Sequence, residues 1–192
     1  FTLFCCQLNA QKKWQDETLQ IAEMEQKGAA RMMEALDANS LFSNASSDFN
    51  IHHYRCEWKL DPAIRFIEGK VTSSFTITSN TNNIIFDLVD SLKVDSVLYL
   101  GSKILYSRPG NHTLKINFPV TLNANTNGSV IIYYQGVPPN ISGFGTFIST
   151  THAGVPVTWT LSEPFGSMEW WPCKNGLNDK ADSLDILITT PD

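Results

Sequence analysis

The spacing of hydrophobic positions changes near residue 50, so different elements are expected on either side. Before that point, 14–36 carries apolar side chains three and four residues apart, at Leu19, Ala22, Ala29, Met33 and Leu36. This spacing places them on one face of an amphipathic helix. The face is rich in alanine and would bury little. We therefore expect a helical leader laid on the domain or, alternatively, a helix that binds a partner.

Beyond a polar linker at 37–50, apolar and polar positions alternate. In 54–60, apolar side chains occupy the even positions, and Arg55, Glu57 and Lys59 lie between them. Such alternation predicts strands with one buried face. Asn127-Gly128 is typical of a tight hairpin. Roughly eight to ten short strands separated by turns predict a mainly β domain, built as an antiparallel sandwich or as curved, saddle-like sheets.

Composition narrows the range of partners. A chain of 192 residues can form one domain with a real core, with or without an appendage. The net charge of −5 argues against nucleic acid as a partner, because phosphate binding needs clustered Lys and Arg. No stretch approaches the roughly 20 apolar residues of a transmembrane helix.

The first residues, FTLFCCQLNAQKK, begin apolar and reach the small Ala10 before Gln11. This pattern resembles the end of a secretory signal peptide. We therefore expect 1–10 to be the end of such a peptide, 11–50 a helical leader and linker, and 51–192 the β domain. The protein would then be exported, to the periplasm, the outer surface or the medium. A buried β edge or a helix start is the other interpretation of the same residues.

Cleavage after Ala10 would leave two cysteines, Cys56 and Cys173. An exported protein permits a disulfide between them, and two buried free thiols are the alternative. They are far apart in sequence, with no histidine at ligand spacing, so they do not indicate a zinc site.

Common catalytic motifs are missing from the sequence. No H-E-x-x-H pair of histidines occurs, and no G-x-S-x-G surrounds a serine. Asp87 with Asp90 is a carboxylate pair that could bind calcium or serve acid–base chemistry, although turn chemistry accounts for it as well. The residues alone therefore define no complete catalytic site.

One segment nevertheless resembles a known family. Residues 156–191 read PVTWTLSEPFGSMEWWPCKNGLNDKADSLDILITTP. They are similar to the end of the N-terminal β domain of M1-family zinc aminopeptidases, which are aminopeptidase N-like enzymes. The run 160–163 matches that family's T-Q-x-E-like segment, 171–173 its F-P-C, and 180–181 the K-A before a final strand. Upstream, 54–75 fits the opening strands, so the resemblance runs from about Tyr54 to Pro191.

The chain also departs from the family pattern. Leu161 stands where the family has Gln, and Ser167 and Met168 stand where a small residue and Arg are expected. Asn175-Gly176 replaces an acidic turn. Contacts with substrate are therefore expected to differ in detail. The resemblance is greatest to divergent bacterial members that carry a secretion signal.

The resemblance assigns a role to Glu163. In the family, the glutamate of the T-Q-x-E-like segment reaches the free α-amino group of the substrate. A carboxylate in a closed, water-poor cleft binds an ammonium strongly and rejects blocked peptides. The resemblance therefore makes Glu163 a substrate-binding residue, whereas an exposed strand-end residue before Pro164 is the alternative.

The resemblance also implies what this chain lacks. The family's Zn²⁺ ligands and catalytic base belong to a separate catalytic domain, so no catalytic or metal residue is expected here. The chain is then the N-terminal substrate-binding and scaffold part of an aminopeptidase, cut before the β domain finishes and inactive alone. Its partners would be peptide N-termini and its own catalytic domain. Trp170 and Trp171 are expected in packing.

The alternative is a secreted, non-catalytic β-sandwich that binds carbohydrate or protein. A planar row of exposed aromatic side chains would favour it. Burial of Trp58, Trp159, Trp170 and Trp171 among the strands would count against it.

Overall fold

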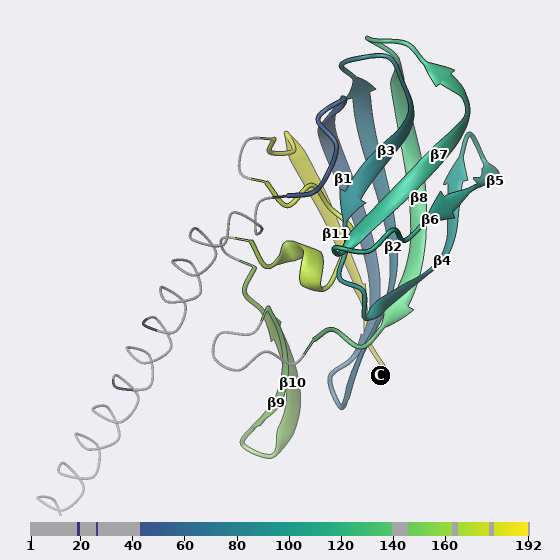
Figure 1. The fold of residues 1–192 in the computed structure, drawn as a ribbon. Helices are drawn as coiled ribbons and strands as arrows, with labels where there is room; N and C mark the ends of the chain where they lie inside the picture. The colour runs from purple at the N-terminus through teal and green to yellow at the C-terminus, as the bar shows by residue number, and fades with distance from the viewer. Residues whose placement is uncertain are drawn as a thin grey trace, which may run out of the picture. The chain divides into compact units, whose positions relative to one another are not determined.

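A computed structural model describes residues 43–139, 146–162, 165–176 and 179–191, together with the isolated positions Leu19 and Gln26 (Figure 1). Phe42–Asn140 and Gly145–Asp192 cluster into one compact unit. The helix predicted at 14–36 lies outside the described residues except at Leu19 and Gln26, where the backbone is helical. The signal peptide predicted at 1–10 lies outside them as well.

The fold is mainly β, as predicted, and its described strands lie in three sheets. The largest has the order β11-β1-β2-β8-β4-β5, with β1 (Phe49–Asp61), β2 (Ile64–Ile77), β4 (Leu92–Tyr99), β5 (Ser102–Ile104), β8 (Asn127–Gly136) and β11 (Ser183–Thr189). The second has the order β3-β7-β6, with β3 (Thr81–Asp87), β6 (Tyr106–Ser107) and β7 (Thr113–Leu122). A separate hairpin of β9 (Phe147–His152) and β10 (Val155–Thr160) precedes the 3-10 helix η1 (Ser167–Glu169).

Strand pairing is antiparallel throughout the described sheets except at one edge. There β11, the last described strand, runs parallel to β1, the first, and pairs with it from His53↔Ser183 to Lys59↔Thr189. A parallel pair needs a long connection between its strands, and here nearly the whole domain lies between them. The two ends of the described domain therefore meet at one sheet edge.

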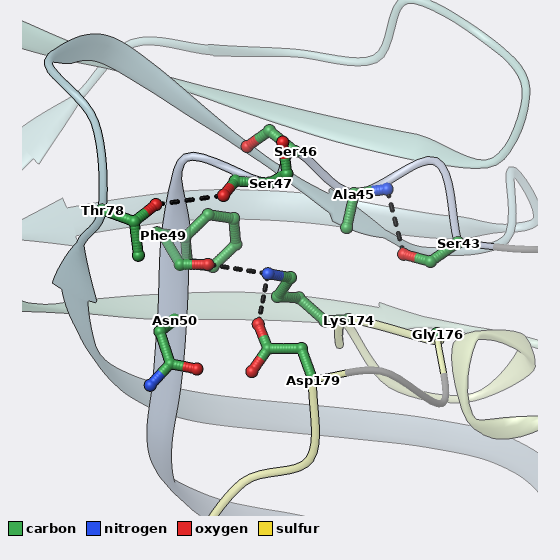
Figure 2. A pocket seen from close by; sticks show the side chains of 10 residues that line it. All are labelled: Ser43, Ala45, Ser46, Ser47, Phe49, Asn50, Thr78, Lys174, Gly176 and Asp179. Atoms are coloured by element: carbon green, nitrogen blue, oxygen red, sulfur yellow. Dashed lines mark hydrogen bonds and ion pairs between the residues drawn. The ribbon is translucent and has the colours of Figure 1, made fainter.

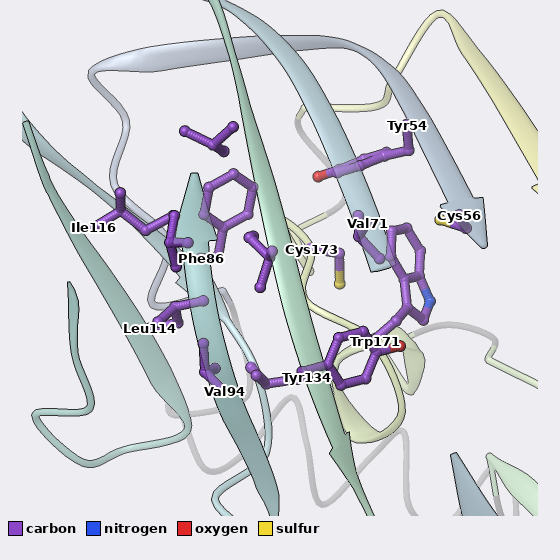
Figure 3. Packing of buried hydrophobic residues seen from close by; sticks show 14 of the residues in the cluster. Tyr54, Cys56, Val71, Phe86, Val94, Leu114, Ile116, Tyr134, Trp171 and Cys173 are labelled. Atoms are coloured by element: carbon purple, nitrogen blue, oxygen red, sulfur yellow. The ribbon is translucent and has the colours of Figure 1, made fainter. Parts of the chain in front are cut away.

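The core lies between the large sheet and the β3–β7 pair, which crosses in front of it in Figure 1. The alternation predicted for 54–60 is confirmed, because all four of its apolar side chains are buried. Across the interface the ring centroids of Phe49 on β1 and Phe86 on β3 lie 5.2 Å apart. Figure 3 shows Leu114 and Ile116 of β7 in the same cluster as Val71 of β2.

The stretch 43–48, expected as part of a linker, is bound to the domain through Asp87. This carboxylate ends β3 and is buried. It accepts hydrogen bonds from the Ser43 hydroxyl, the Asn44 amide at 2.7 Å and the Asn175 amide at 2.9 Å. These donors offset the cost of burying its charge. Asp87 is therefore a buried junction between three segments and not an exposed turn residue.

Candidate functional site

The candidate site is the segment 159–176, which runs from the end of β10 through η1 to the loop after it. Glu163, the predicted substrate-binding residue, lies outside the described residues together with Pro164. Ser162 and Phe165 on either side of them are described. The structure therefore shows how the two flanks of Glu163 are held.

The flanks are tied to each other and to the strand before them. The Trp170 indole N–H donates to the Ser162 hydroxyl at 2.8 Å, and the Gly166 amide donates to the Ser162 carbonyl at 2.8 Å. The Leu161 amide donates to the Thr146 carbonyl at 3.2 Å. These bonds fix the backbone immediately before and after 163–164.

Thr146 makes a second contact with the site through its side chain. Its hydroxyl donates to the Glu169 carboxylate on η1. A Cβ added at Gly166 would lie only 2.0 Å from the Thr146 methyl carbon. The close approach of these chains therefore requires glycine at position 166.

Trp170 and Trp171 of the candidate segment belong to a cluster of aromatic rings. Trp170 and Trp171 are buried, which agrees with their predicted packing role. The Trp58 and Trp170 centroids lie 4.6 Å apart, and those of Tyr54 and Trp171 lie 4.9 Å apart, edge to face. Such rings bury a large apolar area and favour these geometries. The cluster connects η1 to β1.

A buried hydroxyl completes the connection. Tyr134 on β8 accepts a hydrogen bond from the Trp58 indole N–H at 2.9 Å and donates one to the Trp170 carbonyl at 2.9 Å. Burial raises the pKa of Tyr134 well above its usual value, so the phenol stays neutral and can donate. Three segments far apart in sequence thus share one hydrogen-bonded chain. The sequence does not indicate this linking role of Tyr134, because strand alternation predicts only that its side chain is buried.

Gly69 on β2 makes room for that tyrosine. A Cβ there would lie 2.3 Å from Cε1 of Tyr134 and 2.6 Å from its hydroxyl oxygen. The ring therefore occupies the space above Gly69, where no other residue type fits. Glycine inside a strand commonly marks such a close approach.

Cys56 and Cys173 are both buried, and both thiols are free in the structure. The disulfide considered from the sequence is therefore not formed here. Burial raises the pKa of Cys56 to about 12 and that of Cys173 well above its usual value. Burial therefore favours the protonated thiol, the less reactive form, at both positions.

A cavity of about 460 Å³ is lined by Lys174, Gly176 and Asp179 on one side and by residues of 43–50 on another (Figure 2). The Lys174 ammonium beside it donates to the Phe49 carbonyl at 2.7 Å and to the Asp179 carboxylate. It also lies 4.4 Å from the centroid of the Phe49 ring. Through these contacts the Lys174 ammonium links Asp179 to Phe49 of β1.

Within the described ranges, no group of three or more His, Cys, Asp or Glu side chains is arranged to hold a metal ion. His52, for example, contacts the Thr76 hydroxyl at 2.6 Å and the Asp182 carboxylate at 3.4 Å. In the same ranges, no helix has the length and apolar character needed to cross a bilayer.

The tryptophans that a carbohydrate platform would use are divided between two environments. Trp58, Trp170 and Trp171 are buried in the aromatic cluster. Trp159 on β10 is 37% exposed. These four side chains therefore do not form one exposed row.

The chain matches no protein-family model and no curated protein. It does match solved structures. The M1 zinc metallopeptidase from Deinococcus radiodurans is 20% identical, with a TM-score of 0.64 over 77% of this chain and 33% of that one. A mutant of that enzyme bound to a Tyr-Ser-Ala substrate is 21% identical, with a TM-score of 0.63 over 76% of this chain and 33% of that one. Leukotriene A4 hydrolase from Saccharomyces cerevisiae is 18% identical, with a TM-score of 0.62 over 78% of this chain and 24% of that one.

These similarities define the class of fold. The described domain has the fold of a portion of the M1 zinc metallopeptidases, and the predicted resemblance is confirmed at that level. The chain spans about a third of the Deinococcus structures it matches.

Proposed function

We propose that this chain is the N-terminal substrate-binding and scaffold portion of a zinc metallo-aminopeptidase that removes residues from peptide N-termini. The observation that carries the proposal is the fold, which matches three quarters of this chain to one third of an M1 zinc metallopeptidase. The similarity to M1 zinc metallopeptidases supports Zn²⁺ as the cofactor, and the family resemblance assigns it to the catalytic domain of the longer enzyme. There it would polarise the scissile carbonyl and activate water. The chain alone would be inactive.

Within this proposal, Glu163 binds the ammonium group of the substrate. An enzyme that cleaves from the N-terminus must recognise the charge that marks it, and a carboxylate is the complementary group. The hydrogen bonds of Ser162 support the assignment, because they tie the residue before Glu163 to the buried Trp170 and to Gly166 on the other side. Fixed flanks lower the conformational entropy that a glutamate between them loses on binding.

The test is Glu163→Gln in the longer enzyme. Removing one partner of a desolvated charge pair costs about 2–5 kcal/mol, so kcat/KM for free-amine peptides should fall at least about thirtyfold. Peptides with an acetylated N-terminus should be cleaved poorly by both forms. The unfolding midpoint should stay unchanged.

Glu68→Gln is the matched control, since its side chain is 60% exposed on β2. That variant should cleave free-amine peptides as the unaltered enzyme does. An unchanged kcat/KM for Glu163→Gln would remove Glu163 from the binding site.

We also propose export, on the apolar start of the sequence and the small Ala10 before Gln11. N-terminal sequencing of the protein recovered outside the cytoplasm should begin at Gln11. A protein that retains 1–10 would contradict this.

The second candidate function is a secreted, non-catalytic module that binds carbohydrate or protein. The exposed Trp159 on the β9–β10 hairpin favours it, because stacking on sugars needs an accessible aromatic ring. The sequence encoded downstream of Asp192 separates the two proposals. An H-E-x-x-H with a later glutamate supports the aminopeptidase, and a continuation without those ligands supports the binding module.

A further inference from the structure

Thr146, the residue before β9, contacts the candidate site at three points. Its carbonyl accepts a hydrogen bond from the Leu161 amide, its methyl group occupies the space beside Gly166, and its hydroxyl donates to the Glu169 carboxylate. The first of these partners precedes Glu163 in the sequence, and the other two follow it. Because Thr146 is buried, its position is determined by these contacts and not by solvent.

Gly166 connects Thr146 to both flanks of Glu163. The Gly166 amide donates to the Ser162 carbonyl at 2.8 Å, so the two flanks are bonded to each other. A Cβ at Gly166 would meet the Thr146 methyl group and would lie 3.2 Å from Cα of Ser162. The Thr146 side chain is therefore packed against the point at which the flanks join, and a shift of Thr146 would move that point.

The hydroxyl of Thr146 bonds to a charged group on η1. The Glu169 carboxylate accepts this bond, and the Glu169 amide donates to the Gly166 carbonyl at 3.1 Å. A hydrogen bond to a carboxylate is about twice as strong as one between neutral groups. Gly166, the N-cap of η1, has no side chain with which to restrain this short helix. The Thr146 hydroxyl thus supplies from β9 a restraint that the N-cap does not provide.

The residue after Thr146 attaches the same hairpin to η1. The Phe147 and Trp170 ring centroids lie 6.1 Å apart, and the Trp170 indole N–H donates to the Ser162 hydroxyl. Figure 1 shows the open end of the β9–β10 hairpin beside η1. The hairpin and η1 are therefore joined on both sides of Glu163.

We propose that Thr146 is a positioning residue for the site that binds the substrate ammonium group. Through Gly166 and Glu169 it fixes the flanks of Glu163, so that the Glu163 carboxylate meets a free α-amino group. The inference rests on the proposed function, because it takes Glu163 as the ammonium-binding residue. Thr146 does not itself contact the substrate.

Thr146→Val in the longer enzyme tests the hydroxyl, because valine retains the shape of threonine. The ammonium is bound equally in the ground and transition states, so its misplacement should raise KM and leave kcat nearly unchanged. We expect KM for alanyl and leucyl para-nitroanilides to rise about three- to tenfold, the range for one hydrogen bond, and kcat to change by less than about twofold. Thr146→Ser retains the hydroxyl and should restore KM.

Thr150→Val is the matched control, because Thr150 is an exposed threonine on the same strand. It should change neither KM nor kcat. A KM that stays unchanged in Thr146→Val, or that Thr146→Ser does not restore, would overturn the proposal.

A double variant shows whether Thr146 acts through Glu163. In a Glu163→Gln background, Thr146→Val should lower kcat/KM by less than about twofold, because the group that it positions no longer carries the charge. An equal loss in both backgrounds would indicate a general structural effect and overturn the proposal.

Hydrogen exchange measures the restraint without reference to activity. The Gly166 amide, which is bonded to Ser162, should exchange at least about fivefold faster in Thr146→Val than in the unaltered protein. Equal exchange would overturn the proposal. If Glu163→Gln lowers kcat/KM and Thr146→Val does not raise KM, only the role of Thr146 is rejected. If Glu163→Gln has no effect, the role of Glu163 is rejected, and this proposal with it.

Discussion

β1 and β11 lie side by side over seven paired residues, and Leu184, Ile186 and Ile188 of β11 oppose apolar side chains of β1, yet the two strands differ in burial. The inner side chains of β1 are buried, whereas all seven residues of β11 are exposed. The difference lies in what covers them. Trp170 and Trp171 pack over β1, and no described segment covers β11. Alternation therefore tells which face of a strand is apolar, and only tertiary packing decides whether that face is buried.

The largest difference between the two strands should appear when side chains at paired positions of β1 and β11 are shortened to alanine. Trp58→Ala should cost about 3–5 kcal/mol of unfolding free energy, because it empties a buried site and leaves the Tyr134 hydroxyl without its donor. Ile188→Ala, at the position paired with Trp58, should cost no more than about 0.5 kcal/mol in the 192-residue chain. Urea unfolding of both variants gives the two numbers. Equal losses would show that β11 is already packed.

The next largest difference between β1 and β11 should appear in how the free energy of unfolding depends on alkaline pH. Burial raises the pKa of Cys56 from 9.0 to about 12, so between those values the unfolded state binds fewer protons than the folded state. The contribution of this thiol to the unfolding free energy is therefore complete below pH 9. It is lost as the pH rises toward 12, by up to about 1.4 kcal/mol per pH unit.

Urea unfolding at pH 8, 9 and 10 measures this slope. Cys56→Ala should reduce the slope by the share of this thiol, while Cys173 and Tyr134, whose pKa values burial also raises, maintain the rest. Ile186→Ala, at the paired position on β11, should leave the slope unchanged. The same slope in all three proteins would show that Cys56 is accessible to hydroxide.

The smallest expected effect concerns the hydrogen bond between Ser162 of the candidate site and Trp170, which packs against β1. Ser162→Ala and Trp170→Phe each remove one partner of a single hydrogen bond, which contributes about 1 kcal/mol. A double-mutant cycle in urea should give a coupling energy of that size. A coupling near zero would mean that Ser162 is not held by Trp170, and the flank of Glu163 would lose this restraint.

Much of the fold could be predicted from the sequence because the signals are local. Alternation in 54–60 predicted the strand and its buried face correctly. The hairpin turn expected at Asn127-Gly128 was wrong, because both residues lie inside β8 and pair with Thr76 and Phe75 of β2. Roughly eight to ten strands were expected, and the described residues form eleven. The additional short strand Tyr106–Ser107 carries too few residues to show a period.

The rest depends on contacts between distant segments. No local pattern indicates that the last described strand pairs with the first, or that Asp87 accepts bonds from both 43–44 and 175. The resemblance located the segment of Glu163, but the anchoring by Ser162 and Trp170 becomes visible only in three dimensions. Glu163 itself lies outside the described residues, so its role stays a prediction.

The gap left by Gly69 has a consequence for how this domain can change. The Tyr134 ring fills the space of a missing Cβ, and its hydroxyl holds Trp58 and the backbone of Trp170. Any side chain at position 69 would expel that ring, and a smaller residue at position 134 would leave a hole. Substitutions at positions 69 and 134 are therefore coupled, and through the Trp170 carbonyl they also affect the candidate site. In an evolving or redesigned variant, they have to be exchanged together.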